Sequence, residues 1–520
     1  MDARPVRAGF WVVLLVGIFV WAPATYPGYW QSLEGFVPVF NAAPASPIAR
    51  IATTPDLWRG AGSGAFLLAQ PFLLAGLAPT AAVRAIFILS LLLGGLGIYS
   101  WLMPYLGDRA AGLGGLLYML LPPVLATVYV RGSVSDALLL GLLPMALAGL
   151  AAYAAGQSPV AAGVAVLSIL WMWRTQAGLA VFATLLLLLY VMAVERSRLG
   201  TLVVAVSGVA GLTSLLPLWH IAGAPPVDFF DHFVYVDQLL GGAWQVAPSV
   251  PGWQDGYPFF IGLTALAFSA VSLWLWLAGP QAGRPQATSR LLAFAFAGAG
   301  LLLLANLGAS AWLWQITGAH RLLTYPWQVT LLAAPLLAVT AGSIAAHGRP
   351  PAAMPYWAVL VAVAVLGSAP YLTTRFTQAQ PPLRPVAVVG SQGDLVLLDA
   401  QLTEDSAAAA AHLDVTWQVL RPLPFDYNVF FQALTEGDQG DLQTVAQVDV
   451  QPRDGLRPAT TWQAGEILTD TYRLDLSAVM PTLGPDQPGL TYYFGYYDWR
   501  DGTRLPVDGG RDDKVTFYGR

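Results

Sequence analysis

The sequence predicts an all-α polytopic membrane domain of about eleven transmembrane helices, followed by a C-terminal β-sandwich. Of the 520 residues, 56% are hydrophobic and 11% are charged, whereas about 25% of a soluble domain is charged. Apolar runs long enough to cross a bilayer recur as far as residue 373, and short alternating segments follow. A net charge of −5 without a basic patch argues against nucleic-acid binding. The lack of cysteine excludes disulfides, thiolate metal sites and cysteine nucleophiles.

Apolar windows of spanning length predict the positions of the transmembrane helices. They fall near 8–26, 81–104, 110–130, 134–156, 158–174, 177–195, 199–222, 258–279, 290–308, 326–346 and 354–373. The first window follows Arg4 and Arg7 and has some features of a signal peptide, but we assign it to a membrane helix. The stretch 63–79 is apolar and interrupted by Pro71, which predicts a re-entrant or interfacial segment.

The arginines predict the orientation of this membrane domain, residues 1–373. The positive-inside rule places the arginine-rich helix ends in the cytoplasm, and these ends carry Arg4, Arg7, Arg109, Arg196, Arg198, Arg284, Arg290 and Arg349. With an odd number of helices, the long loops 27–62 and 223–257 and the C-terminal tail lie outside. Five arginines remain on the outer side, namely Arg50, Arg59, Arg131, Arg174 and Arg321. They either reach the lipid headgroups or bind an anionic group such as a phosphate.

The tail beyond residue 373 has the pattern of β-strands. Apolar and polar side chains alternate in 412–419, 427–433, 471–476 and 514–518. This alternation predicts an antiparallel β-sandwich over residues 411–520, preceded by a connector, 374–410, with room for one strand. The aromatic run 492–497 fits either the core of the sandwich or a platform for sugar stacking.

Four stretches of the membrane domain have the form of known family motifs. Residues 129–136 with Leu143-Pro144 look like a Tyr-x-Arg-Gly-x-x-x-Glu…Leu-Pro stretch, with Asp136 in place of Glu. Residues 233–240, with Trp244 and Asp255, resemble an outer-loop Gln-Leu-Leu element. Residues 323–328 resemble a Phe-Pro-Trp-Arg element that ends here in Gln328, and residues 55–72 resemble a Gly-rich approach to the second helix.

On these motifs the chain resembles the bacterial 6-pyruvoyl-tetrahydropterin synthase-related membrane family, which is similar to C-type (GT-C, polyprenyl-phosphate-sugar) glycosyltransferases. The resemblance implies a GT-C-like domain in the bacterial inner membrane, with a cytoplasmic N-terminus and an extracytoplasmic sandwich. It also implies a polyprenyl-phosphate sugar as donor substrate. Such a reaction needs a carboxylate that deprotonates the acceptor hydroxyl, and arginines or a divalent cation near the phosphate.

The resemblance and the outer-side placement select the candidate site residues. Glu34 is the first candidate for the catalytic acid and Asp56 the second. The candidates for substrate binding are Arg131, Asp136, Arg174, Gln176, His232, Gln238, His320, Arg321 and Trp327. The arginines would neutralise charge on the phosphate, and the histidines would orient the phosphate or donate protons.

Each candidate also has a plainer interpretation. Glu34 fits a solvated loop acid, Arg131 and Asp136 fit a structural ion pair, and Trp327 fits an interfacial aromatic belt. Four acids of the long outer loop could hold a divalent cation or simply form a charged surface; these are Asp228, Asp231, Asp237 and Asp255.

Two functions therefore stay open. The first is a membrane glycosyltransferase that uses a lipid-linked sugar at the extracytoplasmic face. The second is a catalytically inactive scaffold subunit of an envelope complex, with the sandwich as docking surface for a protein partner. Departures from the motifs favour the second, because Leu33-Glu34-Gly35 stands in place of His-Asp-Gly and Thr175-Gln176 in place of Thr-His. Charged residues are nearly absent from the helix centres and no repeat is visible, which argues against a secondary transporter.

Overall fold

The computed structural model describes most of the chain in two compact units. The described residues are 7–26, 28–30, 32–35, 37–42, 63–213, 228–279, 285–347, 353–373, 376–377, 385–390, 393–405, 408–421, 423–436, 442–462, 466–479, 489–508, 510 and 512–519. The helical unit combines Met1–Pro27 with Pro55–Arg375, and the sandwich unit combines Gly28–Thr54 with Phe376–Arg520. Asp56 lies outside the described residues, as do Arg4, Arg50, Arg59, Arg284 and Arg349.

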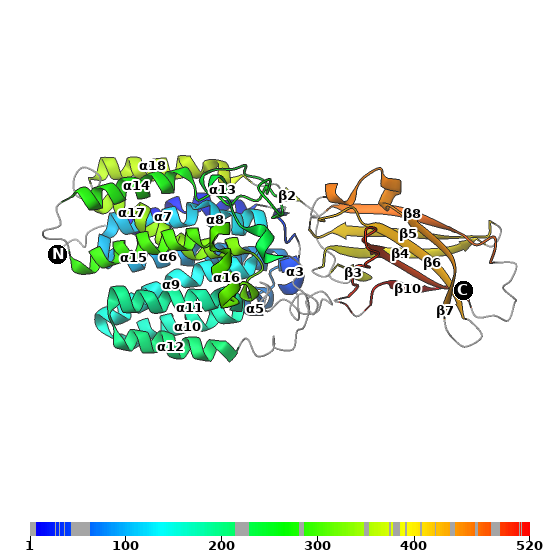
Figure 1. Cartoon of the computed structure of the whole chain (residues 1–520), viewed down its shortest axis with the longest axis horizontal. Coiled ribbons are helices and arrows are strands. Elements are labelled where there is room, and N and C mark those ends of the chain that lie inside the picture. Colours follow the sequence, from blue (N-terminus) through cyan, green and yellow to red (C-terminus); the bar gives the residue numbers. More distant parts are fainter. Residues whose placement is uncertain are drawn as a thin grey trace. The chain divides into compact units, whose positions relative to one another are not determined.

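Each of the eleven predicted windows contains helix (Figure 1). In chain order the helices are Ala8–Thr25 (α1 to η2), α6 (Pro79–Leu106), α7 (Asp108–Leu120), α8 (Pro122–Ala126) with η3 (Thr127–Arg131), α9 (Val134–Gly156), α10 (Pro159–Thr175), α11 (Ala177–Tyr190) with η4 (Val191–Glu195), α12 (Arg198–Gly211), α14 (Leu263–Ala278), α15 (Gln286–Leu304), η9 (Pro326–Val329) with α17 (Thr330–Gly342) and η10 (Ser343–Ala346), and α18 (Met354–Ser368) with η11 (Ala369–Leu372). The apolar stretch interrupted by Pro71 forms α5 (Ser63–Leu74).

Not all of these helices are long enough to count as spans. Among the described residues, seven helices are long and apolar enough to cross a membrane, or eight if the bent pair α7 and α8–η3 is one span. The pair is bent by 42°. The bend falls at Leu121, whose extended backbone precedes Pro122, because a residue before proline avoids the helical region. Helices α10, α12 and α14 are apolar but shorter, so eleven crossings stay a prediction.

Small residues let the central helices pack closely. A Cβ atom added to Gly141 of α9 would lie 2.8 Å from the backbone oxygen of Ser90 in α6. The contact between Gly342 of α17 and Gly114 of α7 is tighter still. A Cβ atom added to Gly342 would lie 2.6 Å from the Cα atom of Gly114. Van der Waals packing of this kind holds membrane helices together, because the lipid is as apolar as the side chains. Helix α17 is central, since 94% of its spanning window is buried.

The sandwich unit consists of two four-stranded antiparallel sheets. One has the order β10 (Val515–Tyr518), β9 (Thr491–Tyr497), β6 (Asn428–Glu436) and β7 (Leu442–Val450). The other has the order β3 (Ala387–Val389), β4 (Leu395–Asp405), β5 (Ala410–Val419) and β8 (Ile467–Asp475). A single hydrophobic core takes side chains from both sheets, among them Trp417 and Phe431. This is the arrangement of a β-sandwich.

Three features of this unit refine the predictions. The connector 374–410 contains β3 and the long strand β4, both of which belong to the sandwich. Residues 28–54 also belong to this unit, and β1 (Tyr29–Trp30) pairs antiparallel with β2 (Phe376–Thr377). In the aromatic run, Tyr492, Phe494 and Tyr496 are buried in the core. Core packing is thus the role of these three rings.

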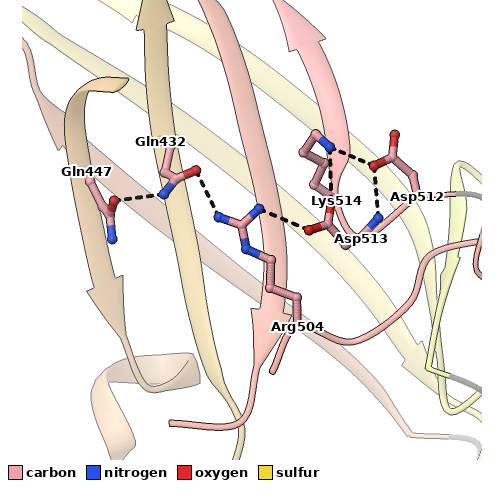
Figure 2. Close-up of polar contacts among 6 residues, drawn as sticks. All are labelled: Gln432, Gln447, Arg504, Asp512, Asp513 and Lys514. Atoms are coloured by element: carbon pink, nitrogen blue, oxygen red, sulfur yellow. Dashed lines mark hydrogen bonds and ion pairs between the residues drawn. The ribbon is translucent and has the colours of Figure 1, made fainter. Parts of the chain in front are cut away.

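The face of the β6–β9 sheet turned away from the core carries a row of polar contacts (Figure 2). Gln432 donates to Gln447 at 2.7 Å, and Arg504 donates to Gln432 at 3.4 Å and to Asp513 at 3.2 Å. Lys514 continues the row with ion pairs to Asp513 and Asp512. The charged side chains of the row are partly exposed, so each ion pair contributes little to stability, typically about 0–1 kcal/mol.

Candidate functional site

Four of the predicted binding residues come together at one end of the helical unit. Arg131 is the last residue of η3, and Asp136 lies in the first turn of α9. Gln176 follows the C-terminus of α10, and Trp327 lies in η9, just before α17. The chain can turn sharply between η3 and α9 because Gly132 adopts a left-handed conformation, with φ of 74°. Four separate elements thus supply one polar cluster.

A buried ion pair is the centre of this cluster. Arg131 donates a hydrogen bond to Oδ2 of Asp136, and Gln176 donates to Oδ1 at 2.8 Å. The Asp136 side chain is fully buried and that of Arg131 is 11% exposed. A buried carboxylate is tolerated only when its oxygens are paired, and the N-terminus of α9 adds a favourable dipole. The structural ion pair expected from the sequence is therefore present, and it positions the guanidinium.

Stacked aromatic rings support the guanidinium. Trp327 stacks between Tyr257 and Tyr325, with ring centroids 4.6 Å and 5.0 Å away. We call these three residues the aromatic column. The Cζ atom of Arg131 lies 5.6 Å from the centre of the Trp327 ring, within the range of a cation–π interaction. Trp327 is 5% exposed, so it belongs to the cluster and is not simply an interfacial anchor.

A hydrogen-bonded chain of three side chains adjoins the column. His232 packs edge-on against Tyr325, with centroids 5.1 Å apart. Its Nδ1 atom lies 2.9 Å from Oγ of Ser249, which in turn donates to Oδ2 of Asp255 at 2.6 Å. The backbone N–H of Tyr257 donates to the other carboxylate oxygen at 2.9 Å. We call His232, Ser249 and Asp255 the histidine relay.

Burial determines the protonation of the relay. It lowers the pKa of His232, although the carboxylates of Asp231 and Asp228 oppose the shift. Burial likewise raises the pKa of Asp255, and hydrogen bonds from Ser249, Tyr257 and Val250 oppose that shift. Because the ordinary pKa of histidine is about 6.5, the imidazole of His232 is mainly neutral at pH 7.

Several buried donors near the ion pair lack an acceptor among the described residues. They are the hydroxyls of Ser135 and Thr175 and the indole N–H of Trp327. Ser135 and Thr175 are the chain neighbours of Asp136 and Gln176, and Trp327 lies beneath Arg131. A buried polar group without a partner costs about 1–3 kcal/mol. The Trp327 donor adjoins the guanidinium, and the two hydroxyls come from the helix ends that supply Asp136 and Gln176, so this end of the helical unit is suited to an oxygen-rich anion.

The other predicted binding residues make different contacts. Arg174 and Arg321 are exposed, and no contact between either of them and the ion pair is found in the described part of the chain. His320 contacts the backbone oxygen of Trp314 at 3.0 Å and packs on Phe230. Gln238 accepts from the backbone of Tyr235 and donates to that of Trp253, which holds the loop together.

The two predicted acids lie outside the described residues of the helical unit. Glu34 is half-buried and belongs to the sandwich unit, where its backbone oxygen accepts from Val37 at 3.0 Å. Asp56 lies outside the described residues. Within the described ranges, no three acidic, histidine or cysteine side chains lie close enough to hold a metal ion. The divalent cation therefore has no ligand set among these residues.

Sequence reasoning missed Tyr257, Tyr325 and Ser249 as site residues. Tyr325 directly precedes the Pro326-Trp327 pair that was singled out, so its position in the motif was the available signal. Ser249 and Tyr257 lie in a loop whose sequence has no helical or strand periodicity. Their contacts with His232 and Trp327 form only in the folded chain.

Comparisons with known proteins add little. No family model matches the chain, and no curated protein matches it. Among solved structures, the chain is similar to the crystal structure of ArnT from Cupriavidus metallidurans in the apo state. The TM-score is 0.30 and the identity 17%, over 66% of this chain and 78% of that one. A likeness this weak supports no inference about the chain, so the family resemblance drawn from the motifs stays a prediction.

Proposed function

We propose that the chain is a GT-C-like membrane glycosyltransferase that acts on a lipid-phosphate-linked sugar at the extracytoplasmic face. The observation that carries this proposal is the largely buried Arg131 guanidinium, at helix ends that also carry unsatisfied donors. Thr175 and Trp327 each present a buried donor without an acceptor among the described residues. Phosphate oxygens can accept several hydrogen bonds at once and match a guanidinium in geometry.

The surroundings of the cluster favour a lipid-borne anion over a free one. The cluster lies at the ends of apolar helices, among them α9, whose length and composition suit a membrane span. A phosphate at that depth arrives most readily on a lipid, with its polyprenyl tail among the helices and its sugar toward the loops. Arg174 and Arg321, both exposed, would attract the headgroup before it reaches Arg131.

The residue roles follow from this placement. Arg131 and Thr175 would bind the phosphate, and Gln176 would hold Asp136 so that the guanidinium keeps its position. Stabilisation of the leaving phosphate by fixed donors contributes most to such a transfer. Glu34 and Asp56 remain predictions for the acid that activates the acceptor.

The binding of a short-chain polyprenyl phosphate to the purified protein tests the proposal. Arg131→Ala should weaken the binding at least tenfold, whereas Arg198→Ala, which removes an exposed arginine at the start of α12, should leave it unchanged. Thr175→Val is a second test variant, in case Arg131→Ala fails to fold. It removes a buried hydroxyl that has no described acceptor, so it should weaken binding without loss of stability. Equal affinity in all variants would contradict the proposal.

The scaffold function keeps one observation in its favour. Arg131 and Asp136 already neutralise each other. A scaffold of this kind would give no measurable affinity for polyprenyl phosphate in the wild-type protein, so the same assay separates the two functions.

A further inference from the structure

We propose that His232 is the group that accepts the proton of the acceptor hydroxyl, and that Ser249 and Asp255 fix the imidazole tautomer that this role requires. The inference rests on the proposed transferase function and replaces Glu34 in one of its steps. It is carried by the geometry of the histidine relay, which lies in the helical unit together with Arg131.

The single proton of the Ser249 hydroxyl determines the tautomer. Ser249 donates that proton to Asp255, at an Oγ–Oδ2 distance of 2.6 Å. In its 2.9 Å contact with His232, the same hydroxyl oxygen must therefore accept, so Nδ1 of the imidazole carries the hydrogen. In a neutral imidazole the lone pair is then on Nε2. No hydrogen bond to Nε2 is found among the described residues. The lone pair on Nε2 can therefore accept a proton.

The charges around the ring suit a base that works near neutral pH. Burial keeps the imidazole neutral and lowers its pKa. Asp231, in the same 3-10 turn η6 (Phe229–His232), and Asp228, just before that turn, favour the protonated form through their charges. From the loop, Asp255 acts through Ser249, and Tyr325, the residue before η9, packs its neutral ring edge-on. The base is thus neutral before the step, and its cation is stabilised after it.

The chemical step then balances without a further reagent. The acceptor oxygen forms a bond to the anomeric carbon as the bond between that carbon and the phosphate oxygen breaks. The lipid phosphate leaves with the bonding electron pair beside Arg131. The hydroxyl proton moves to Nε2 of His232, and the imidazolium is stabilised by the carboxylate of Asp255 through Ser249. Proton transfer to a well-placed base contributes about 10²–10⁴-fold to a rate.

Nitrogen-15 NMR of histidine-labelled protein tests the tautomer without any substrate. The chain has five histidines, and loss of one signal in His232→Gln assigns the residue. We expect a neutral ring with hydrogen on Nδ1 at pH 7, and a change toward the other tautomer in Ser249→Ala. Ser310→Ala, which alters a serine bonded to the backbone oxygens of Ala305 and Leu307, should leave the signal unchanged. Hydrogen on Nε2 in the wild-type protein would overturn the proposal.

The pH at which His232 titrates is a second readout. Because the carboxylate of Asp231 raises the pKa of His232, Asp231→Asn should lower that pKa. The acid limb of the transfer rate should move to lower pH together with the NMR titration. Asp237→Asn, an exposed acid in α13 (Val236–Leu240), is the matched control. A shifted titration with an unshifted rate profile would show that His232 does not take the proton, and would overturn the proposal.

The transfer assay separates the inference from the function on which it rests. His232→Gln should lower the transfer rate about 100-fold or more while the affinity for polyprenyl phosphate is kept, and the control variant Ser310→Ala should transfer at the wild-type rate. If His232→Gln transfers normally, the inference fails and the transferase function stands. If the wild-type protein binds no polyprenyl phosphate and transfers no sugar, the function itself fails, and the proton role fails with it.

Discussion

At the scale of single residues, the site depends on one buried acid. Asp136 belongs to α9, but its two side-chain partners come from η3 and from the end of α10. If one partner of such a pair is lost, a charged group stays buried without compensation, which costs about 3–5 kcal/mol. Asp136 thus ties three elements together and fixes the position of the guanidinium that we assign to the phosphate.

Asp136→Ala should therefore lower the free energy of unfolding by about 3–5 kcal/mol, because the largely buried Arg131 guanidinium would lose its carboxylate partner. Thermal unfolding in detergent micelles measures the effect. Asp237→Ala removes an exposed acid and should change stability by no more than about 0.5 kcal/mol. If Asp136→Ala unfolds at the wild-type temperature, the ion pair does not hold these elements together.

Part of this site could be predicted from the sequence. Arg131 and Asp136 were identified because their motif places both at the start of one helix, and the structure brings them into contact. Arg174 was grouped with them because it was placed on the same outer side, but it lies two residues before Gln176 at the end of α10, and residues two apart do not point the same way. Gln176 therefore reaches Asp136, while Arg174 is exposed. Hydropathy identifies the end of a helix and leaves the rotation of its side chains undetermined.

At the scale of the elements, apolar length predicted the helices well and alternation predicted the strands less completely. Every predicted window contains helix. An uninterrupted apolar segment of about 20 residues rarely forms anything but a membrane helix. The connector was given room for one strand, but the bounds of β4 could not be predicted, because its first residues, Leu395, Val396 and Leu397, are all buried and only its second half alternates. A strand that is buried on both faces resembles any other short apolar run.

The close contact between α6 and α9 makes a prediction at this scale. Gly141→Ala should destabilise the protein by about 1–3 kcal/mol, because the new Cβ would meet the rigid backbone of Ser90. Gly163→Ala in α10 is the matched control: nothing lies within 4 Å of its added Cβ, so it should be neutral or stabilising by up to about 1 kcal/mol. The unfolding temperatures of the two variants should move in opposite directions, and equal shifts would contradict the packing.

At the scale of the whole molecule, the chain combines a helical unit with a sandwich unit that draws on two distant segments. The pairing of Tyr29–Trp30 with Phe376–Thr377 could not be predicted, because two-residue strands have no recognisable pattern. The charge pattern predicts that the loop 223–257 is extracytoplasmic. The proposed reaction at the extracytoplasmic face requires this orientation.

Cysteine labelling tests the orientation directly, because the chain contains no cysteine. Gly241 and Gly156 are both exposed, with nothing within 4 Å of an added Cβ, so either tolerates cysteine. We expect a membrane-impermeant maleimide to label Gly241→Cys on intact cells, and to label Gly156→Cys only after the membrane is opened. The reverse pattern would put the Arg131 cluster on the cytoplasmic side.

Mass spectrometry of the lipids that co-purify with the wild-type protein tests the central claim most directly. We predict that a polyprenyl phosphate or its sugar conjugate is enriched over the bulk membrane, and that the enrichment is lost in Thr175→Val, which leaves the ion pair intact. A lipid profile equal to that of the surrounding membrane, or the same enrichment in both proteins, would contradict a phosphate-binding site at Arg131.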